Sequence, residues 1–520
     1  MAVSERLAPS TTAPPAPRAG ALGRRAWKLT RRWLYVIHRW AGIATCLLCA
    51  MWFVSGVVMM YVPFPSVTER ERMAFSAPVD WAQVRVAPDA AVRAAGFAEP
   101  TQVRLTMFRG TPVYRVAAGR KSATVSAVDG LPLGRTGAEG ALDVVRRARP
   151  DAPNPTIRSV RSDQWTVAQG FTPHRPLWRV DLGDRVGTQL YVSSRTGEIV
   201  DDTTRGERFW NWLGAVPHWI YFEAIRRDGP SWRQWVMWTS GPTAVGAVLG
   251  IWIGILRLRL RRRYAGDRVS PYAGWMKWHH VSGLVAGLFV VTWLFSGWLS
   301  VNPFGWFDRQ PASKAGTLAY LGGSRPGGLP AFSPDPAVLR GLPAGWAREA
   351  RLAGFAGRPL WVLQDAGLRR RVFDGRSGAE VRLSDAEVFA AAARLVPGAR
   401  VVHAERLTAE DDYWYTHGGE RPTGRLPMLR VRFDDRERTW AHIDPQTGEV
   451  VNRSGASART YRWLFNALHD FDLRFLLHHR PLWDLVVLAL SAGGLIVSVS
   501  GVVIGWRRLG RKLASARAPG

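Results

Sequence analysis

Four long uncharged runs of mostly apolar residues constrain this chain more than any other feature. They cover residues 41–62, 235–256, 281–302 and 485–506, and each is 22 residues long. A helix of that length spans about 30 Å of hydrocarbon. The sequence therefore predicts four transmembrane helices, with most of the 520 residues lying outside lipid.

The positive charge of the chain lies close to these runs. The formal net charge is +29, and segments 1–40, 257–280 and 507–520 carry +18 of it. If the four runs alternate across a bilayer, all three basic segments fall on one face, which the positive-inside rule identifies as cytoplasmic. Both termini are then cytoplasmic. The basic composition needs no nucleic-acid partner, and we expect none.

The lengths between the runs predict the domain boundaries. Two long connections must form folded domains on the outward face, because a long connection cannot lie in lipid as irregular chain. The predicted boundaries are a basic cytoplasmic tail at 1–33, helices at 34–62, 235–256, 281–302 and 485–506, outward domains at 63–234 and 303–484, a basic cytoplasmic loop at 257–280, and a cytoplasmic tail at 507–520.

The chain also repeats itself, which indicates a duplication. At an offset of 241, His38 pairs with His279 and Ser55-Gly56 with Ser296-Gly297. At an offset of 251, the later matches are Thr196-Gly197-Glu198 with Thr447-Gly448-Glu449, Trp212 with Trp463, His218 with His469, Gly250 with Gly501, and Gly254 with Gly505. Two such units side by side would form a four-helix bundle.

The outward domains show strand and helix patterns. Residues 188–192 and 440–443 alternate and are each followed by a turn sequence, which predicts hairpins. Residues 141–148 and 385–395 have apolar side chains at helical spacing. The predicted fold class is an α+β membrane protein, with four transmembrane helices from two duplicated units and an outward α/β domain in each unit.

Histidines are the strongest candidates for chemistry. The repeat organises four of them into two pairs, His38 with His279 near the cytoplasmic ends of their runs, and His218 with His469 in aromatic segments near the outward face. Two imidazoles on facing helices are what a six-coordinate b-type haem requires. We therefore predict up to two haem b groups, with these four histidines as ligands of the haem iron. Catalytic residues remain unassigned.

The histidines are also compatible with roles that involve no haem. None of them falls inside the four runs, whereas a deeply buried haem needs its ligands there. His38 and His279 fit equally well as interfacial residues that pair with lipid headgroups or cap a helix. His279 and His280 are adjacent and point about 100° apart on a helix, so only one faces the interior; the repeat favours His279.

Several motifs resemble the bacterial PepSY-associated transmembrane helix family, also described as PepSY domain-containing membrane proteins. The resemblance covers about residues 33–508, and its most specific pieces are His38-Arg39-Trp40-Ala41-Gly42, the segment 208–219, the segment 278–284, and Arg480-Pro481-Leu482-Trp483-Asp484. Members are similar to inner-membrane proteins of iron uptake, and some resemble haem-containing ferric-siderophore reductases. The resemblance implies that residues 63–234 and 303–484 are periplasmic PepSY-like domains.

These observations lead to one expected function and two alternatives. The expected function is a haem protein of the bacterial inner membrane that moves electrons from a cytoplasmic or quinol donor to an outward acceptor such as a ferric chelate. The first alternative is a non-enzymatic, membrane-anchored PepSY binding or regulatory module. The second is a transporter subunit, although the runs contain no charged residue that would mark an ion or solute pathway.

Overall fold

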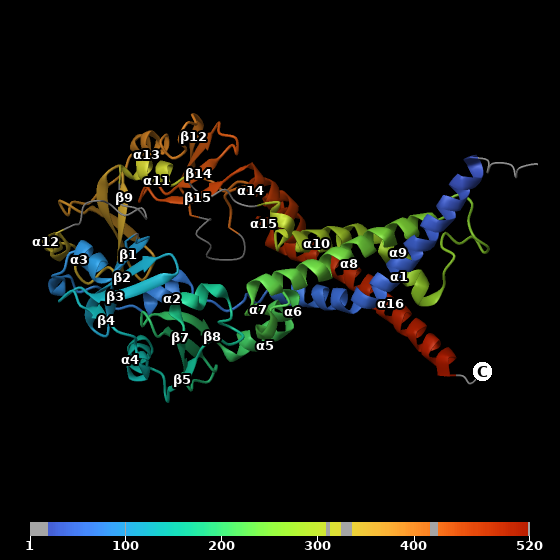
Figure 1. Cartoon of the computed structure of the whole chain (residues 1–520), viewed down its shortest axis with the longest axis horizontal. Coiled ribbons are helices and arrows are strands. Elements are labelled where there is room, and N and C mark those ends of the chain that lie inside the picture. The colour runs from blue at the N-terminus through green and yellow to red at the C-terminus, as the bar shows by residue number, and fades with distance from the viewer. Residues whose placement is uncertain (1–18, 99, 308–312, 324–334, 417–424, 518–520) are drawn as a thin grey trace, which may run out of the picture. The chain divides into compact units, whose positions relative to one another are not determined.

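The computed structural model describes residues 19–98, 100–307, 313–323, 335–416 and 425–517. The chain, drawn in Figure 1, divides into two compact units. The first unit comprises Met1–Ala50, Gly241–Leu294 and Ala492–Gly520. The second comprises Met51–Ser240 and Phe295–Ser491. Residues 1–18 of the predicted basic tail lie outside the described residues.

Three of the four apolar runs form long helices, with residues 60–62 of the first run lying beyond the helix end. These are α1 (Ala19–Met59), α8 (Gly229–Arg257) and α16 (Arg480–Arg517). By length and composition, segments Arg24–Met59, Gly229–Arg257 and Arg480–Ala514 can each cross a membrane. The helices begin or end well beyond the apolar runs, because arginine and lysine are good helix formers. Hydropathy therefore locates the lipid-facing part of a helix and not the ends of the helix.

The third run departs from the single helix that the sequence predicts. It forms α9 (Gly274–Val285) and α10 (Gly287–Leu299), which are bent by 67° at the break between them. Glycines are frequent at such kinks. Gly287 also lies against α8, since a Cβ added there would be 2.9 Å from Ile251 Cγ1. Together the two helices pass the same length and hydropathy criteria as a broken span.

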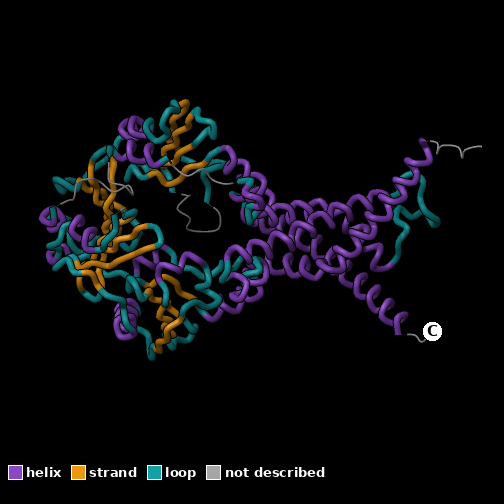
Figure 2. Tube along the Cα trace, in the orientation of Figure 1, coloured by secondary structure: helices purple, strands orange, loops and turns teal. Residues whose placement is uncertain are grey.

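The first unit is built from helical segments (Figure 2). Several of these segments approach one another closely at small residues. Where glycines face neighbouring helices, the backbones come close enough for extensive van der Waals contact, as is common between membrane helices. An added Cβ would lie within 3.3 Å of the neighbouring helix at four contacts, which are Gly246 with Ala41, Gly254 with Leu284, Gly493 with Ala286, and Gly505 with Ile43.

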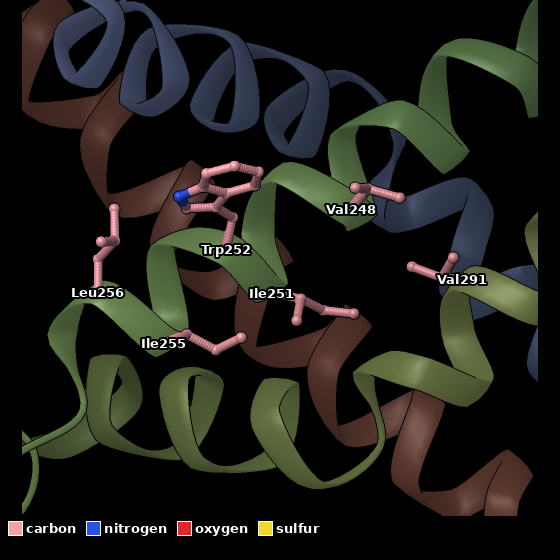
Figure 3. Close-up of a pocket in the computed structure, with 6 residues that line it drawn as sticks. All are labelled: Val248, Ile251, Trp252, Ile255, Leu256 and Val291. Atoms are coloured by element: carbon pink, nitrogen blue, oxygen red, sulfur yellow. The ribbon is translucent and has the colours of Figure 1, made fainter. Parts of the chain in front are cut away.

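A shallow groove of about 380 Å³ runs along α8 in the same unit (Figure 3). Five of its lining residues lie on α8 and one, Val291, on α10. All six side chains are aliphatic or indole, which is the composition expected of a helix surface that faces lipid. The lining residues are Val248, Ile251, Trp252, Ile255, Leu256 and Val291.

The second unit contains the three sheets that the described residues form. A seven-stranded antiparallel sheet has the order β11-β10-β9-β1-β2-β3-β4. Strands β1 and β9 pair with Arg104 opposite Arg351, so strands from both long connections share this sheet. Its strands are β1 (Gln102–Phe108), β2 (Thr111–Ala118), β3 (Lys121–Ser126), β4 (Pro132–Leu133), β9 (Glu349–Phe355), β10 (Arg358–Gln364) and β11 (Arg370–Asp374).

Two further sheets have four antiparallel strands each, in the orders β5-β6-β7-β8 and β12-β13-β14-β15. The β7–β8 and β14–β15 pairs confirm the predicted hairpins. Helices α4 (Ala138–Ala148) and α13 (Asp385–Ala392) confirm the two predicted helical segments. The strands are β5 (Thr156–Val160), β6 (Leu177–Asp181), β7 (Gln189–Ser193), β8 (Ile199–Thr203), β12 (Val401–Leu407), β13 (Met428–Phe433), β14 (Trp440–Ile443) and β15 (Val450–Ser454).

Short helices connect these sheets to the long helices. Those that position candidate functional residues are α6 (Ala215–His218), α7 (Glu223–Arg226), the π-helical η5 (Arg462–Ala467) and α15 (Arg474–Leu477). The other short helices are α2 (Glu69–Ala74), η1 (Trp81–Gln83), α3 (Pro88–Ala94), η2 (Gln169–His174), α5 (Arg205–Leu213), η3 (Pro303–Gly305), α11 (Lys314–Leu321), α12 (Pro336–Arg340) and α14 (Ala456–Tyr461).

A buried ionic network lies on one face of the seven-stranded sheet. The Arg104 guanidinium contacts Glu198 at 2.9 Å and Glu349 at 2.8 Å, and Arg115 lies 3.3 Å from Glu198. Burial by itself would raise the pKa of Glu198, but the two arginines outweigh it and hold that pKa well below its usual range. The Glu of the first Thr-Gly-Glu turn therefore links its hairpin to the central sheet.

Candidate histidine sites

The first histidine pair, His38 and His279, comes together inside the first unit. His38 lies on α1 and His279 on α9, and their ring centroids are 6.2 Å apart with an interplanar angle of 37°. In the sequence, both residues stand just outside the apolar runs. In the structure they lie within helices, because α1 and α9 begin before the runs do. The candidate ligands are therefore inside the helical unit, where a haem can be sheltered.

Hydrogen bonds orient both rings of the first pair. His38 Nδ1 lies 2.9 Å from the Gly246 carbonyl oxygen, and His279 Nδ1 lies 3.1 Å from the Val497 carbonyl oxygen. A carbonyl oxygen only accepts, so each Nδ1 donates and carries the proton. The lone pair of the neutral imidazole is then on Nε2. This arrangement is typical of histidines that bind a metal through Nε2.

Glycines provide room beside the first pair. A Cβ added to Gly250 of α8 would lie 2.5 Å from His38 Cε1, a distance that real Cβ atoms do not reach. A Cβ added to Gly501 of α16 would lie 3.4 Å from His279 Cε1 and 2.5 Å from Cys46 Sγ. Gly250 and Gly501 are repeat-related positions, so both copies leave the same space next to a histidine.

The second histidine pair, His218 and His469, has the same spacing. These residues belong to the second unit, and their ring centroids are 6.2 Å apart with an interplanar angle of 66°. His218 Nδ1 lies 3.1 Å from both the Trp52 carbonyl oxygen and Ser55 Oγ. His469 Nδ1 lies 3.0 Å from Ser296 Oγ. The two serines are repeat-related, and each bonds the histidine of its own copy.

The glycines that follow these serines also contact the second pair. A Cβ on Gly56 would lie 3.1 Å from His218 Cε1, and one on Gly297 would lie 3.3 Å from His469 Cε1. The repeated Ser-Gly dipeptide is visible in the sequence, but its role is not. The structure shows that the serine orients the ring and that the glycine leaves space for it.

His218 is held as a neutral imidazole. Burial is the main cause that lowers its pKa to about 3, and the neighbouring His469 adds to that effect. A neutral imidazole has the nitrogen lone pair that a metal requires. Near neutral pH this residue is therefore in the form that binds a metal.

Aromatic contacts make the two members of the second pair unequal. Phe465 of η5 stacks on the His469 ring with centroids 5.2 Å apart and an interplanar angle of 13°. Tyr461 stacks in turn on Phe465, also at 5.2 Å. The repeat-related position to Phe465 is Gly214, where the first copy ends α5. His469 thus has an aromatic support that the repeat does not give His218.

The spacing of both pairs fits a haem iron. An imidazole nitrogen binds a transition metal at about 2 Å, and the ring centroid lies roughly 1 Å beyond that nitrogen, so two axial imidazoles have centroids about 6 Å apart. Among the described residues, no group of three or more His, Cys, Asp or Glu could hold a metal ion. A haem needs only two protein ligands because the porphyrin supplies the other four. The donor set and the spacing of the two rings therefore fit a haem with two axial histidines.

The structure distinguishes the role of His279 from that of the adjacent His280. His280 is buried, with Nδ1 2.9 Å from Ser270 Oγ and Nε2 2.9 Å from the Gly254 carbonyl oxygen. Both ring nitrogens are used in these hydrogen bonds, so no lone pair is left for a metal. His279 is therefore the member that pairs with His38, as the repeat predicts.

Comparison with known proteins identifies the family of this chain. The family described as PepSY-associated TM region matches residues 35–337, which is more than half of the chain. The chain belongs to this family. The match confirms the resemblance carried by the motifs and makes this PepSY-associated protein a membrane protein. It includes His38, His218 and His279 and ends before His469. No curated protein matches the chain.

Proposed function

We propose that this PepSY-associated protein is a b-type haem protein of the bacterial inner membrane that passes electrons across the membrane, with a ferric siderophore as the outward acceptor. The observation that supports this most directly is the geometry of the two histidine pairs. Each pair has a centroid separation of 6.2 Å and comes from both copies of the repeat. A duplicated four-helix bundle with two periplasmic domains is part of the same proposal.

Each ligand has a supporting group within the chain. His38 and His279 would hold one haem, and His218 and His469 the other. Backbone carbonyl oxygens accept from Nδ1 of His38, His218 and His279 and would leave Nε2 of those rings for iron. Ser296 Oγ bonds His469 at Nδ1. When bound, haem supplies a one-electron carrier that needs no proton transfer from the protein.

Charge supports the proposed orientation. The basic segments at 1–40, 257–280 and 507–520 would face the cytoplasm. On that face, a separate cytoplasmic protein or a quinol would donate electrons near His38 and His279. The second pair would then serve the periplasmic acceptor.

Absorbance spectra of the detergent-purified full chain test the assignment. We expect a reducible Soret band in the wild type. His38→Ala and His279→Ala should lose the same part of the signal, and His218→Ala and His469→Ala the other part. His403→Ala is a matched control, because His403 lies exposed on β12 outside both pairs. It should keep the full signal.

Two results would reject the proposal. One is a colourless protein from haem-replete cells, which would favour a PepSY binding module or a transporter subunit. The other is wild-type absorbance in all four ligand variants. The acceptor is tested separately, by following haem reoxidation after addition of a ferric siderophore to the reduced protein.

A further inference from the structure

A groove of about 460 Å³ lies on the segment that carries His469. One wall residue, Trp463, is six positions before His469, and most of the others follow it at positions 473–479. All belong to the second unit. The groove is open to solvent. The lining residues are Asp412, Trp463, Leu473, Arg474, Phe475, His478 and His479.

The polar groups of this groove are available to a ligand. Within the part of the chain that the structure describes, the side chains of Arg474 and His478 make no hydrogen bond or ion pair. His479 Nδ1 lies 2.7 Å from the Phe475 carbonyl oxygen, so it donates and leaves Nε2 as an acceptor. Asp412 adds a carboxylate acceptor to the lining.

The aromatic wall is held in place. Trp463 Nε1 donates to Tyr413 Oη at 3.0 Å, and the Arg462 guanidinium lies over the indole ring at 4.4 Å from its centroid. A ring fixed on both sides loses little freedom when a planar ligand stacks on it. Phe475, which is largely exposed, provides a second aromatic surface.

The repeat supplies an internal comparison. At the position of Arg474 the first copy has Glu223, which is already bonded within its own domain. Its backbone N–H donates to Gln164 Oε1 at 3.0 Å, and its carboxylate accepts from Ser162 Oγ at 3.1 Å. The other replacements from the second copy to the first are Leu473 to Phe222, Phe475 to Ala224, His478 to Arg227, and His479 to Asp228. The first copy thus keeps aromatic rings and a cation but has neither imidazole, and the ring of Phe475 is absent from it.

We propose that this groove binds a planar aromatic ligand with two adjacent oxygens, of the catechol type. The guanidinium fork of Arg474 suits two neighbouring oxygen atoms of a planar group. Asp412 and His479 Nε2 accept from a ligand hydroxyl that remains protonated. The aromatic walls hold the ring. The proposal deepens the proposed function, on which it rests for its redox meaning, since it assigns an acceptor chemistry to the segment of the second histidine pair.

Isothermal titration of the full chain in detergent with 2,3-dihydroxybenzoate tests this directly. We expect binding by the wild type, with benzoate and inorganic phosphate binding at least about tenfold more weakly. Arg474→Gln should weaken dihydroxybenzoate binding at least about tenfold, as loss of a charge-assisted hydrogen bond does. Phe475→Ala, which restores the residue of the first copy, should weaken it as well. Arg480→Gln is the control, because Arg480 pairs with Asp484 outside the groove.

Three outcomes would overturn the site. They are no binding of the wild type at millimolar ligand, unchanged binding by Arg474→Gln, and displacement by phosphate as effective as by the ring, which would indicate a lipid phosphate or a free anion instead. Titration does not require haem, so the two proposals can fail separately. If the haem bands are absent but dihydroxybenzoate still binds, only the proposed function is refuted. If the haem bands are present but dihydroxybenzoate does not bind, only this site is refuted.

Discussion

Gly250→Ala tests the first histidine pair through a single methyl group. The added Cβ would lie 2.5 Å from His38 Cε1, whereas ordinary contacts begin at 3.4 Å. The ring or α8 must therefore move by about 0.9 Å, the difference between those two distances. A metal–nitrogen bond near 2 Å tolerates about 0.2 Å. We expect the variant to lose the haem proposed to bind between His38 and His279.

The same change should leave the protein folded. Overpacking costs about 1–3 kcal/mol. Alanine is better than glycine by about 1 kcal/mol in a helix interior, so the net destabilisation is at most about 2 kcal/mol. Loss of haem would then not be explained by loss of structure. Thermal unfolding of the purified protein measures this directly.

The assay is the reduced-minus-oxidised absorbance spectrum together with haem content per chain. We expect roughly half of the wild-type haem in Gly250→Ala. Gly283→Ala is the matched control, because Gly283 lies on α9 one turn after His279 and an added Cβ would meet nothing within 4 Å. Full haem content and an unchanged spectrum in Gly250→Ala would refute the proposed ligand geometry.

Three further perturbations test other parts of the structure. Phe465→Leu removes the ring stacked on His469, so the low-temperature paramagnetic resonance signal of the haem proposed at the second pair should shift, while that of the haem proposed at the first pair stays unchanged; identical spectra would contradict a positioning role for Phe465. Glu198→Gln leaves the buried Arg115 without its carboxylate and Arg104 with Glu349 alone, and should cost about 3–5 kcal/mol at pH 7. Because the pKa of Glu198 is lowered in the folded state, the stability that this carboxylate contributes is present above about pH 4.3 and decreases as the pH falls toward the folded-state pKa. The difference between the melting temperatures of variant and wild type should therefore become smaller in acid. A difference that does not change with pH would show that the ionised carboxylate is not its cause. Gly316→Ala drives a Cβ into the Leu395 carbonyl oxygen, a backbone atom that cannot move aside, and should lower the melting temperature far more than an alanine at an exposed helical glycine.

Hydropathy and charge were sufficient to predict a membrane protein, and the sequence repeat selected the candidate histidines. Family membership also followed from local motifs, and the match over residues 35–337 confirms it. Local sequence patterns predicted the elements whose conformation is decided by residues that are neighbours in the sequence. The hairpins at β7–β8 and β14–β15 and the helices α4 and α13 are of this kind.

Features that depend on contacts between residues far apart in the chain came only from the folded structure. The pairing of β1 with β9, the 67° break before Gly287 and the two centroid separations of 6.2 Å all arise from packing of distant segments. The repeated glycines and serines beside the histidines were visible as matches, but only the folded chain shows which ring each one faces. A sequence specifies the identity of a ligand and its local helix, whereas the distance between two ligands is set by how the helices pack.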